Sequence, residues 1–223
     1  MEYIKDQIPI LISVRKQSER CPNKVCRDFY DGKSLTEIAL EKFKGRKDVY
    51  LSAYEDEFKD IADKYEVNFL PRPYESAMGE TQEVIRGYLK DTFPYEQILS
   101  YNVCCPFTKT ETADKAIETY KKANSNALFL VYSFFEVVLD HHKKPLTPDA
   151  LVFNSKMRRP QYKISNNFII MNMKTFWERD CQVIENFEEE DACFYEIEEM
   201  ETLDIDTEAQ FRIVQSIYRE NMK

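Results

Sequence analysis

The sequence predicts an α/β protein of three layers, in which a mostly parallel, Rossmann-like sheet lies between helices. Segments with the apolar pattern of strands alternate with segments of helical spacing from residue 8 to residue 138, the order expected of a parallel sheet with helical crossovers. The first strand, residues 8–14, is apolar on both faces, as expected where helices cover both sides of a sheet. No linker rich in Pro, Gly or Ser divides the 223 residues, so we expect a single domain over residues 1–223.

Each expected strand and helix has a local reason. The helix at 35–43 follows Ser34, a residue type favoured as an N-cap. The strand at 67–70 is cut short by the Pro-Arg-Pro that begins at Pro71. The helix at 110–124 has acidic residues in its first turn and lysines in its last, which suits the helix dipole. The remaining expected elements are strands at 48–53, 97–104, 127–138, 168–171 and 193–197, and helices at 57–65, 81–93, 174–179 and 207–218.

The alternation of strands and helices breaks at about residues 139–165, where we expect an excursion from the sheet. The excursion is polar, contains Pro, and carries a basic cluster formed by Lys156, Arg158 and Arg159. The adjacent His141 and His142 fall in it, and exposed surface is a simpler interpretation of both than acid–base chemistry. The acidic stretch at 185–191 is most simply a solvated loop or helix face.

The composition argues against several classes of protein. A formal net charge of -9 argues against broad, sequence-independent nucleic-acid binding, which needs a cationic surface. No apolar run approaches the roughly 20 residues of a membrane span, and the first residues lack the basic and apolar regions of a signal peptide. We therefore expect a cytoplasmic protein that binds neither membrane nor nucleic acid.

The cysteines predict neither a disulfide framework nor a zinc site. The chain has 6 cysteines without a CxxC pair, and its 2 histidines are adjacent. We expect reduced, mostly buried thiols. Cys104 and Cys105 fall beside the expected ligand cleft, where one of them could be reactive, but small size is the simpler reason for a cysteine there.

A loop rich in basic residues directly follows the first strand. It contains Arg15, Ser18, Arg20 and Lys24, whose charged groups can neutralise adjacent phosphates while the hydroxyl donates to the same oxygens. Because parallel sheets bind ligands at the carboxyl ends of their strands, this loop is a candidate triphosphate site. It lacks the glycines of a Walker A or dinucleotide motif. Taken alone, a solvated basic loop is the simpler interpretation.

Two aspartates near the other end of the chain form a second candidate site. In an extended segment Asp204 and Asp206 point to the same side, while Leu203 and Ile205 point into the core. Magnesium binds through one or two carboxylates and takes its other ligands from water and substrate phosphates, so this pair would suffice beside a triphosphate. Taken alone, the segment has a simpler interpretation, in which Asp206 or Thr207 caps the last helix and Asp204 is exposed.

Together the two segments resemble the cytidylyltransferases that activate sialic acids and related sugar acids, the CMP-N-acylneuraminate and CMP-KDO synthetases. That family opens with a strand and an Ala-Arg-x-x-Ser-x-Arg-x-Pro-x-Lys loop, which residues 14–24 (VRKQSERCPNK) match apart from the alanine. It closes with Asp-Ile-Asp-Thr before a helix, and residues 204–207 are that motif unchanged. The resemblance implies a nucleotidyltransferase fold of the nucleotide-diphospho-sugar transferase type, with an excursion that serves dimerisation and the acceptor.

Weaker matches fall in the same order between these two motifs. Residues 32–35 (GKSL) are similar to the Gly-Lys-Pro-Leu that starts the family's first helix. Residues 69–73 (FLPRP) are similar to a Phe-Leu-Arg-Pro whose arginine, here Arg72, lies near the nucleotide. Residues 158–162 (RRPQY) and Asn166 resemble the Arg-Arg-Gln and Asn-Gly of the family's acceptor side.

Departures from the family pattern concern the acceptor more than the nucleotide. The family's Gln-x-Thr-Ser-Pro-Leu-Arg segment reads NVCCPFT at residues 102–108, so Asn102 still offers an amide but the arginine is missing unless Lys109 serves. The family's Ser-Thr-Asp after the second strand reads Ser-Ala-Tyr at residues 52–54. These departures leave the identity of the acceptor open.

The resemblance implies a Mg²⁺-dependent transfer of CMP from CTP to the anomeric hydroxyl of a 2-keto sugar acid, with release of pyrophosphate, by a homodimer. The residues that would bind the nucleotide are Arg15, Ser18, Arg20, Lys24, Arg72 and Asn102. The catalytic residues would be Arg15, Lys24 and the two metal ligands Asp204 and Asp206. The residues that would bind the acceptor are Arg158, Arg159 and Asn166, with Lys163 as a further candidate for its carboxylate. Two alternatives are a nucleotidyltransferase of the same fold with another acceptor, and a noncatalytic nucleotide-binding protein.

Overall fold

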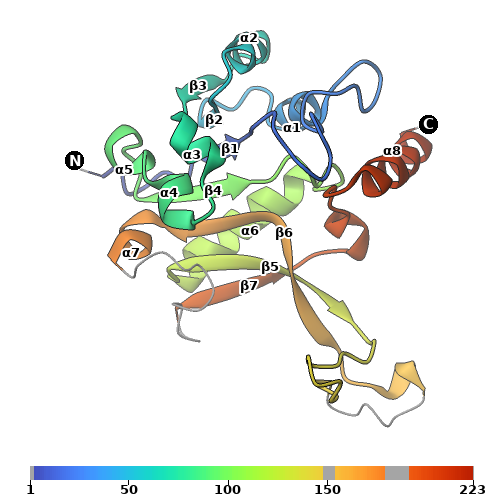
Figure 1. Ribbon diagram of the computed structural model, residues 1–223. Coiled ribbons are helices and arrows are strands. Elements are labelled where there is room, and N and C mark those ends of the chain that lie inside the picture. Colours follow the sequence, from blue (N-terminus) through green and yellow to red (C-terminus); the bar gives the residue numbers. More distant parts are fainter. Residues whose placement is uncertain (1–2, 148–153, 179–190, 223) are drawn as a thin grey trace.

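A computed structural model describes residues 3–147, 154–178 and 191–222 and shows three layers, with a sheet between helices (Figure 1). The sheet has seven strands in the order β3-β2-β1-β4-β6-β5-β7. β6 runs antiparallel to both of its neighbours, whereas the other pairings are parallel. The prediction of a mostly parallel, helix-covered sheet is confirmed.

The elements follow the expected order along the chain. The strands are β1 (Ile10–Ser13), β2 (Val49–Ala53), β3 (Asn68–Pro71), β4 (Gln97–Tyr101), β5 (Ala127–Phe134), β6 (Gln161–Asn172) and β7 (Ala192–Glu196). The helices are α1 (Leu35–Lys42), α2 (Glu57–Lys64), α3 (Tyr74–Met78), α4 (Gln82–Arg86), α5 (Leu89–Thr92), α6 (Thr110–Ala123), α7 (Met173–Glu178) and α8 (Glu208–Asn221), with the 3-10 turns η1 (Ser155–Met157) and η2 (Glu199–Thr202).

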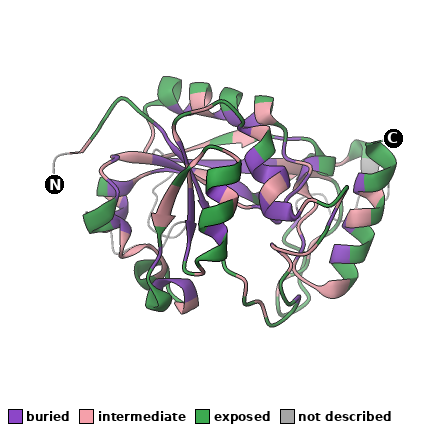
Figure 2. Ribbon diagram, turned by 90° about the horizontal axis from the view of Figure 1, so that it is seen from above, coloured by how far each residue is buried: buried purple, intermediate pink, exposed green. Residues whose placement is uncertain are grey.

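Each face of the sheet has its own apolar core. The larger core joins the sheet to α1, α2, α6 and α8, and the smaller one joins it to α5 and α7. Strand β1 serves both, because Ile10 and Ile12 belong to the larger core and Leu11 to the smaller. The helices accordingly show buried residues toward the sheet and exposed residues away from it (Figure 2). Burial on both faces is why the first strand lacks polar alternation.

The order of the strands creates one switch point. From β1 the chain moves to β2 on one side and later returns to β4 on the other side of β1. The connections after β1 and β4 therefore diverge at their carboxyl ends, and in open α/β sheets a ligand crevice forms at such a point.

The expected helix at 81–93 is wrong in extent. It is divided into α4 and α5 at Gly87, which caps the end of α4, and glycine is a poor helix former. The preceding α3, which begins directly after Pro73, was not expected from the sequence. These short helices leave a turn at residues 79–81 over the carboxyl end of β1.

The expected excursion at 139–165 is partly strand. β5 ends at Phe134 and β6 begins at Gln161, so the two strands continue past the sheet as an antiparallel ribbon (Figure 1). Their pairing shifts between Phe129 and Leu130, which marks a β-bulge where the ribbon leaves the sheet. We call this ribbon with its described connection, residues 130–147 and 154–165, the arm.

Several sequence expectations concern residues beyond those described. Cys181 and the acidic stretch at 185–191, apart from Asp191, lie outside the described residues. Among the helices that are described, none combines the length and the apolar character that crossing a membrane would require.

Candidate active site

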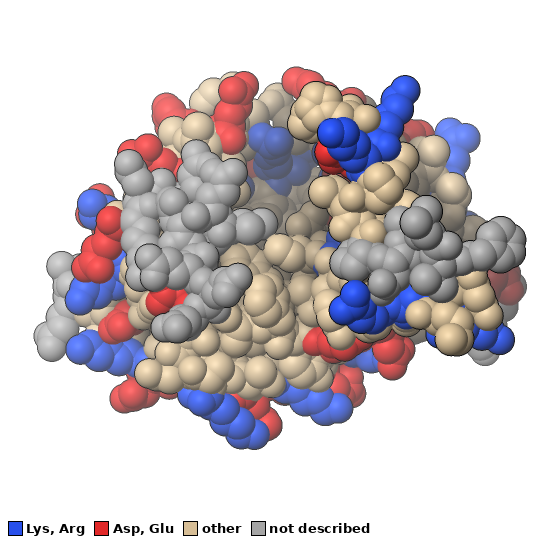
Figure 3. All heavy atoms as spheres, turned by 90° about the horizontal axis from the view of Figure 1, so that it is seen from below, with Lys and Arg blue, Asp and Glu red and all other residues tan. Residues whose placement is uncertain are grey.

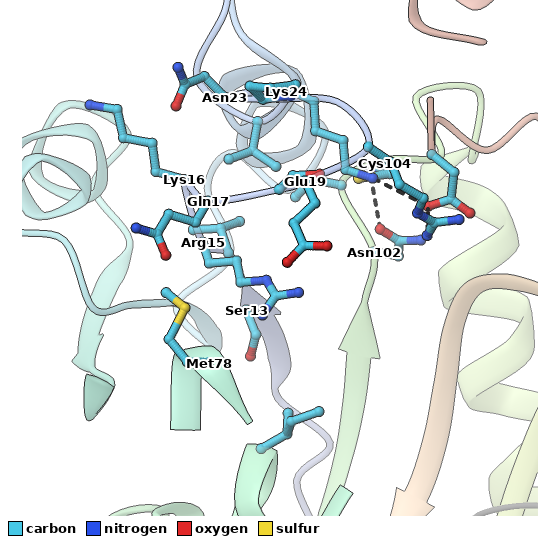
Figure 4. Close-up of a pocket in the computed structure, with 18 of the residues that line it drawn as sticks. Ser13, Arg15, Lys16, Gln17, Glu19, Asn23, Lys24, Met78, Asn102 and Cys104 are labelled. Carbon is cyan, nitrogen blue, oxygen red and sulfur yellow. Dashed lines mark hydrogen bonds and ion pairs between the residues drawn. The ribbon is translucent and has the colours of Figure 1, made fainter. Parts of the chain in front are cut away.

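A cavity of about 980 Å³ opens at the carboxyl ends of β1 and β4, at the switch point (Figure 4). The basic loop after β1 forms much of its wall, the turn after α3 and the loop after β4 form more, and Asp206 closes one side. The lining residues are Ser13, Val14, Arg15, Lys16, Gln17, Ser18, Glu19, Arg20, Pro22, Asn23, Lys24, Val25, Met78, Gly79, Glu80, Ile85, Asn102, Val103, Cys104 and Asp206. A mostly polar cavity of this size is suited to a charged ligand.

The structure brings the two candidate segments together. The Lys24 ammonium donates a hydrogen bond to the carbonyl oxygen of Ile205 and lies 3.4 Å from Asp206 Oδ1. The Arg20 guanidinium lies 3.0 Å from the same carboxylate oxygen. Lys24 therefore shares one site with Ile205 and Asp206, which lie 181 and 182 positions further along the sequence.

Local structure explains how the basic loop holds its shape. Asn23 adopts a positive φ of 57°, which asparagine tolerates, and its carbonyl oxygen accepts from the amides of Cys26 and Arg27. The Thr36 hydroxyl donates to the carbonyl oxygen of Val25 at 2.8 Å. The predicted N-cap Ser34 is confirmed, since it forms a capping box with Glu37 at the start of α1.

The acidic segment is extended, as expected, between η2 and α8. Ile205 is fully buried, and its amide donates to the carbonyl oxygen of Cys104 at 3.0 Å. Thr207 caps α8 through a capping box with Gln210, so that part of the simpler interpretation is found. Asp206 instead faces the cavity. Asp204 is half-buried rather than exposed and is not a lining residue, and its buried Oδ1 has no hydrogen-bond partner among the described residues.

The surroundings of Asp204 disfavour the ionised form of its carboxyl. Desolvation raises the pKa of the Asp204 carboxyl, and the nearby Asp206 charge raises it further, while Lys24 opposes both. A carboxyl whose pKa is raised on folding gives stability below its unfolded pKa, and that stability is lost as the pH rises through the folded pKa. An ionised Asp204 therefore destabilises the metal-free fold at neutral pH.

Replacing Asp204 by Asn should raise the melting temperature of the protein at pH 7 in the presence of a chelator. The neutral amide removes the charge that burial disfavours, and the gain should shrink as the pH falls toward about 4, where aspartate protonates in the unfolded chain. Thermal unfolding at several pH values measures both effects. Asp206→Asn is the matched control and should not stabilise, because Asp206 pairs with Arg20 and Lys24. A lower melting temperature for Asp204→Asn would contradict the assigned electrostatics.

The donor set at this segment fits a hard divalent cation. Asp204 has an unpartnered buried oxygen, Asp206 lines the cavity, and a hard cation can complete its shell with phosphate oxygens and water. Within residues 3–147, 154–178 and 191–222, no group of three or more His, Cys, Asp or Glu side chains could hold a metal by itself. The two carboxylates therefore suit a cation that a ligand helps to hold.

The loop after β4 places Asn102 and Cys104 at the cavity. Asn102 Oδ1 accepts from the Cys104 amide at 2.9 Å, a contact visible in Figure 4. Burial raises the pKa of the Cys104 thiol to about 11, which suits a small buried residue and not a nucleophile. The described cysteines are all free, as expected.

Arg72 does not line the cavity. The residue is 8% exposed, and its guanidinium donates to Ser76 in α3, through Nε to Oγ at 2.9 Å and through Nη2 to the carbonyl oxygen at 2.8 Å. Arg15, which does line the cavity, donates to the carbonyl oxygen of Ala77 at 2.8 Å. Both arginines thus hold the end of α3, beside the lining residues Met78 and Gly79.

Of the candidate acceptor residues, Arg158 and Arg159 lie on the arm and Asn166 directly follows it, and none of them lies at the cavity. Arg158 donates to the carbonyl oxygen of Phe135 at 2.9 Å, and Asn166 is exposed at the bulge. Neither these two nor Arg159 is a lining residue. The ring centroids of His141 and His142 lie 3.7 Å apart on exposed surface of the arm, as expected.

Several lining residues carried no signal in the sequence. The end of α3 contributes Met78 and the turn after it contributes Gly79 and Glu80, and their position depends on short helices that the apolar pattern did not predict. Glu19 lies inside the basic loop, and its carboxylate points into the same space as Arg15 (Figure 4). The sequence analysis selected the basic residues of this loop as phosphate ligands and therefore did not select an acidic one.

Comparison with known proteins agrees with this geometry. A family model described as Cytidylyltransferase matches residues 10–222. A CMP:2-keto-3-deoxy-manno-octonic acid synthetase complexed with CTP is similar in structure, with a TM-score of 0.70 at 11% identity over 97% of this chain and 100% of that one.

Two further solved structures share the fold. A 4-diphosphocytidyl-2C-methyl-D-erythritol synthase from Anaerococcus prevotii has a TM-score of 0.65 at 16% identity, over 98% of this chain and 96% of that one. A cytidylyltransferase from Leptospira borgpetersenii has a TM-score of 0.61 at 18% identity, over 96% and 87%. A search of curated proteins finds no match. The expected nucleotidyltransferase fold is confirmed.

Proposed function

The chain belongs to the cytidylyltransferase family, and from this premise we propose that it transfers CMP from CTP to the anomeric hydroxyl of a 2-keto sugar acid, with Mg²⁺, releasing pyrophosphate. The observation that carries the proposal is the cavity itself. A cationic loop from one end of the chain meets Asp206 from the other end there, and Asp204 lies two residues before Asp206. The proposal that the acceptor is a sugar acid depends on the family resemblance of the motifs at residues 14–24 and 204–207.

The residues of the cavity can perform this transfer by positioning and charge neutralisation. Arg15, Ser18, Arg20 and Lys24 bind the triphosphate oxygens, and Asn102 offers an amide to the ribose or base. The acceptor hydroxyl loses its proton, its oxygen attacks the α-phosphorus in line, and the bond to the bridging oxygen breaks. Lys24 and Arg15 offset the charge that develops on the departing pyrophosphate.

The aspartate pair provides the place for the cation. Asp204 and Asp206 would hold Mg²⁺, which when bound supplies charge neutralisation at the α-phosphate. A cation held by the pair would also explain why the buried Oδ1 of Asp204 has no hydrogen-bond partner among the described residues. Functional sites often lower the stability of a protein when their ligand is absent.

The proposed activity is tested by incubating the purified protein with CTP, Mg²⁺ and a panel of 2-keto sugar acids. Pyrophosphate should be released with at least one sugar acid, and mass spectrometry should detect the matching CMP-sugar. Reactions without acceptor and with a chelator are the controls. CTP binding without pyrophosphate release across the panel would reject the sugar-acid acceptor.

A second candidate is transfer of CMP to another kind of acceptor, and one observation favours it. Lys109, which could have replaced the family's missing arginine, pairs with Glu198 at 2.7 Å and is not a lining residue. The loop after β4 therefore presents no cation to an acceptor's carboxylate. A similar fold occurs in an enzyme whose name specifies a methylerythritol product, so polyol phosphates belong in the panel.

The proposed enzyme is a homodimer joined through the arm. Large apolar side chains of the arm are exposed, among them Leu146 at 62%, Met157 at 72% and Tyr162 at 57%. The face of the molecule seen in Figure 3 also carries a broad area without charged side chains. Exposed apolar surface of this kind marks an interaction site. Arg158, Arg159 and Asn166 would then serve the acceptor across the dimer.

Replacing both Met157 and Tyr162 by Glu should convert the dimer into a monomer, because buried charge opposes association. Analytical ultracentrifugation measures the mass, and circular dichroism confirms the fold. Ile213→Glu is the matched control, since Ile213 is 59% exposed on α8, away from the arm. A wild-type protein that sediments as a monomer would reject the dimer.

A further inference from the structure

Lys42, at the end of α1, has an ammonium group that the proposed reaction does not use. Its partners are two main-chain carbonyl oxygens, those of Pro106 and of Thr108, the latter at 2.8 Å. Burial lowers the pKa of Lys42 to about 8, with Cys105 and Glu201 as the charged or titratable groups that oppose the shift. A lysine is usually exposed, so withdrawing its ammonium group from water calls for a reason.

The two carbonyl groups belong to the loop after β4, whose other end lines the cavity. Asn102, Val103 and Cys104 are lining residues, and Pro106 and Thr108 follow directly. The loop is also bonded internally, because the Thr108 hydroxyl and amide both donate to the carbonyl oxygen of Cys105. A displacement at Thr108 would therefore be transmitted to the cavity wall.

The same loop holds the acidic segment. The carbonyl oxygen of Cys104 accepts from the amide of Ile205, the residue between Asp204 and Asp206. Ile205 is fully buried, and its carbonyl oxygen accepts from Lys24. The position of both carboxylates thus depends on the position of Cys104.

A buried carboxylate anchors the loop from the opposite side. Glu201 is 3% exposed, and its Oε2 accepts from the Lys109 amide at 2.9 Å and from the Thr112 hydroxyl at 2.8 Å. Asn167 joins the two anchors, since its Nδ2 donates to Thr108 Oγ1 and to the carbonyl oxygen of Glu201, each at 2.7 Å. The loop is therefore fixed by a buried polar network in which Lys42 provides the contact from α1.

We propose that Lys42 is a positioning residue for nucleotidyl transfer, which sets the loop after β4 and, through Cys104 and Ile205, the placement of Asp206 at the cavity and of Asp204 beside it. Lys42 touches neither the cavity nor the reacting atoms, so it acts through the loop. The inference rests on the cavity being the CTP site, and it does not depend on which acceptor the enzyme uses.

The test compares Lys42→Met, which keeps the apolar stem and removes the donors, with Lys42→Arg, which keeps charged donors. Hydrogen exchange read by NMR measures the Ile205 and Thr108 amides, and calorimetry measures CTP binding with Mg²⁺. Lys42→Met should speed exchange at both amides and weaken CTP binding, each by about tenfold, the scale of one lost buried hydrogen bond. Lys42→Arg should recover most of both.

Two further variants keep the test decisive. Thr108→Val removes the hydroxyl that links Asn167 to the loop, and it should give the same pattern if Lys42→Met fails to fold. Tyr50→Phe is the control for lost stability, because it removes a hydrogen bond of 2.7 Å to the Tyr95 hydroxyl in the other core. It should lower the melting temperature and leave Ile205 exchange and CTP affinity unchanged.

The outcomes separate this inference from the proposed function. Exchange at Ile205 and CTP affinity of Lys42→Met within roughly twofold of wild type would reject the positioning role, whatever the melting temperature does. If no acceptor in the panel reacts, the sugar-acid transfer is rejected. Amide exchange and CTP binding would still test the positioning role of Lys42. Wild-type protein that does not bind CTP would overturn the inference along with the cavity assignment.

Discussion

Replacing Asp206 by Ala is expected to lower turnover by on the order of 10²–10³-fold, the cost of removing one electrostatic group from a preorganised site. Asp206 is the carboxylate of the pair that lines the cavity, and its Oδ1 lies 3.0 Å from Arg20 and 3.4 Å from Lys24. Its loss would remove a proposed ligand of Mg²⁺, and it would also free the Arg20 and Lys24 side chains that pair with it. Pyrophosphate release at saturating CTP and acceptor measures the change, and circular dichroism reports the fold.

The control for Asp206 is another ion-paired aspartate, far from the cavity. Asp63 pairs with Lys59 on α2 at 3.0 Å, and Asp63→Ala should leave the rate unchanged. An Asp206→Ala protein with the wild-type rate would reject the metal role of the pair. Wild-type protein that binds CTP but turns over no acceptor of any class would instead indicate a noncatalytic nucleotide-binding protein.

Replacing Phe29 by Ala is expected to lower the free energy of unfolding by about 3–5 kcal/mol, a large part of the roughly 5–15 kcal/mol that holds a domain folded. Phe29 is fully buried, and its ring contacts those of Phe211 and Tyr218 in α8, each with centroids 5.4 Å away. Its carbonyl oxygen also accepts from Gln215 at 2.8 Å. Urea denaturation measures the loss.

The contacts of Phe29 matter because they connect α8 to the chain that follows the basic loop. Nearby, Arg27 pairs with Glu208 at 2.9 Å and lies 3.9 Å from the Phe211 ring centroid. Tyr54→Ala is the control, since Tyr54 is 47% exposed and its ring contacts Tyr74, and it should cost less than about 1.5 kcal/mol. Equal losses for Phe29→Ala and Tyr54→Ala would show that α8 is held elsewhere.

Much of the fold could be predicted because its signals are local. The spacing of apolar residues alternates between that of strands and that of helices, and this predicted the order of the elements. Ser34 and Thr207 are capping residues with the expected sequence pattern. The helix at 81–93 could not be resolved, because Gly87 is compatible with a weak helix as well as with a break. The start of β6 was missed because the arm leaves the sheet, so Tyr162 and Lys163 are exposed instead of showing strand burial.

The candidate site was predictable where residue type and sequence spacing decide it. Arg15, Lys24 and Asp206 all line the cavity, and the spacing within each motif pointed to them. Arg72 shows the limit, because the sequence gives an arginine near a strand end but not the direction of its side chain. Whether its side chain reaches the cavity or α3 depends on α3 itself, a helix that the apolar pattern of the sequence did not predict. Lys42 shows the same limit, since nothing local marks a lysine that turns inward.

The pairing of Lys24 with the Ile205 carbonyl and Asp206 has a consequence for the growing polypeptide. Strands β1 to β4 end at Tyr101, so their residues are synthesised about 100 residues before Asp206, which contacts a lysine 182 residues behind it. Contacts of such long range form late because closing the intervening chain costs entropy. We therefore expect a nascent chain to contain its cationic loop before the contact with Asp206 can form, so that the cavity is completed only when α8 packs against the rest of the chain.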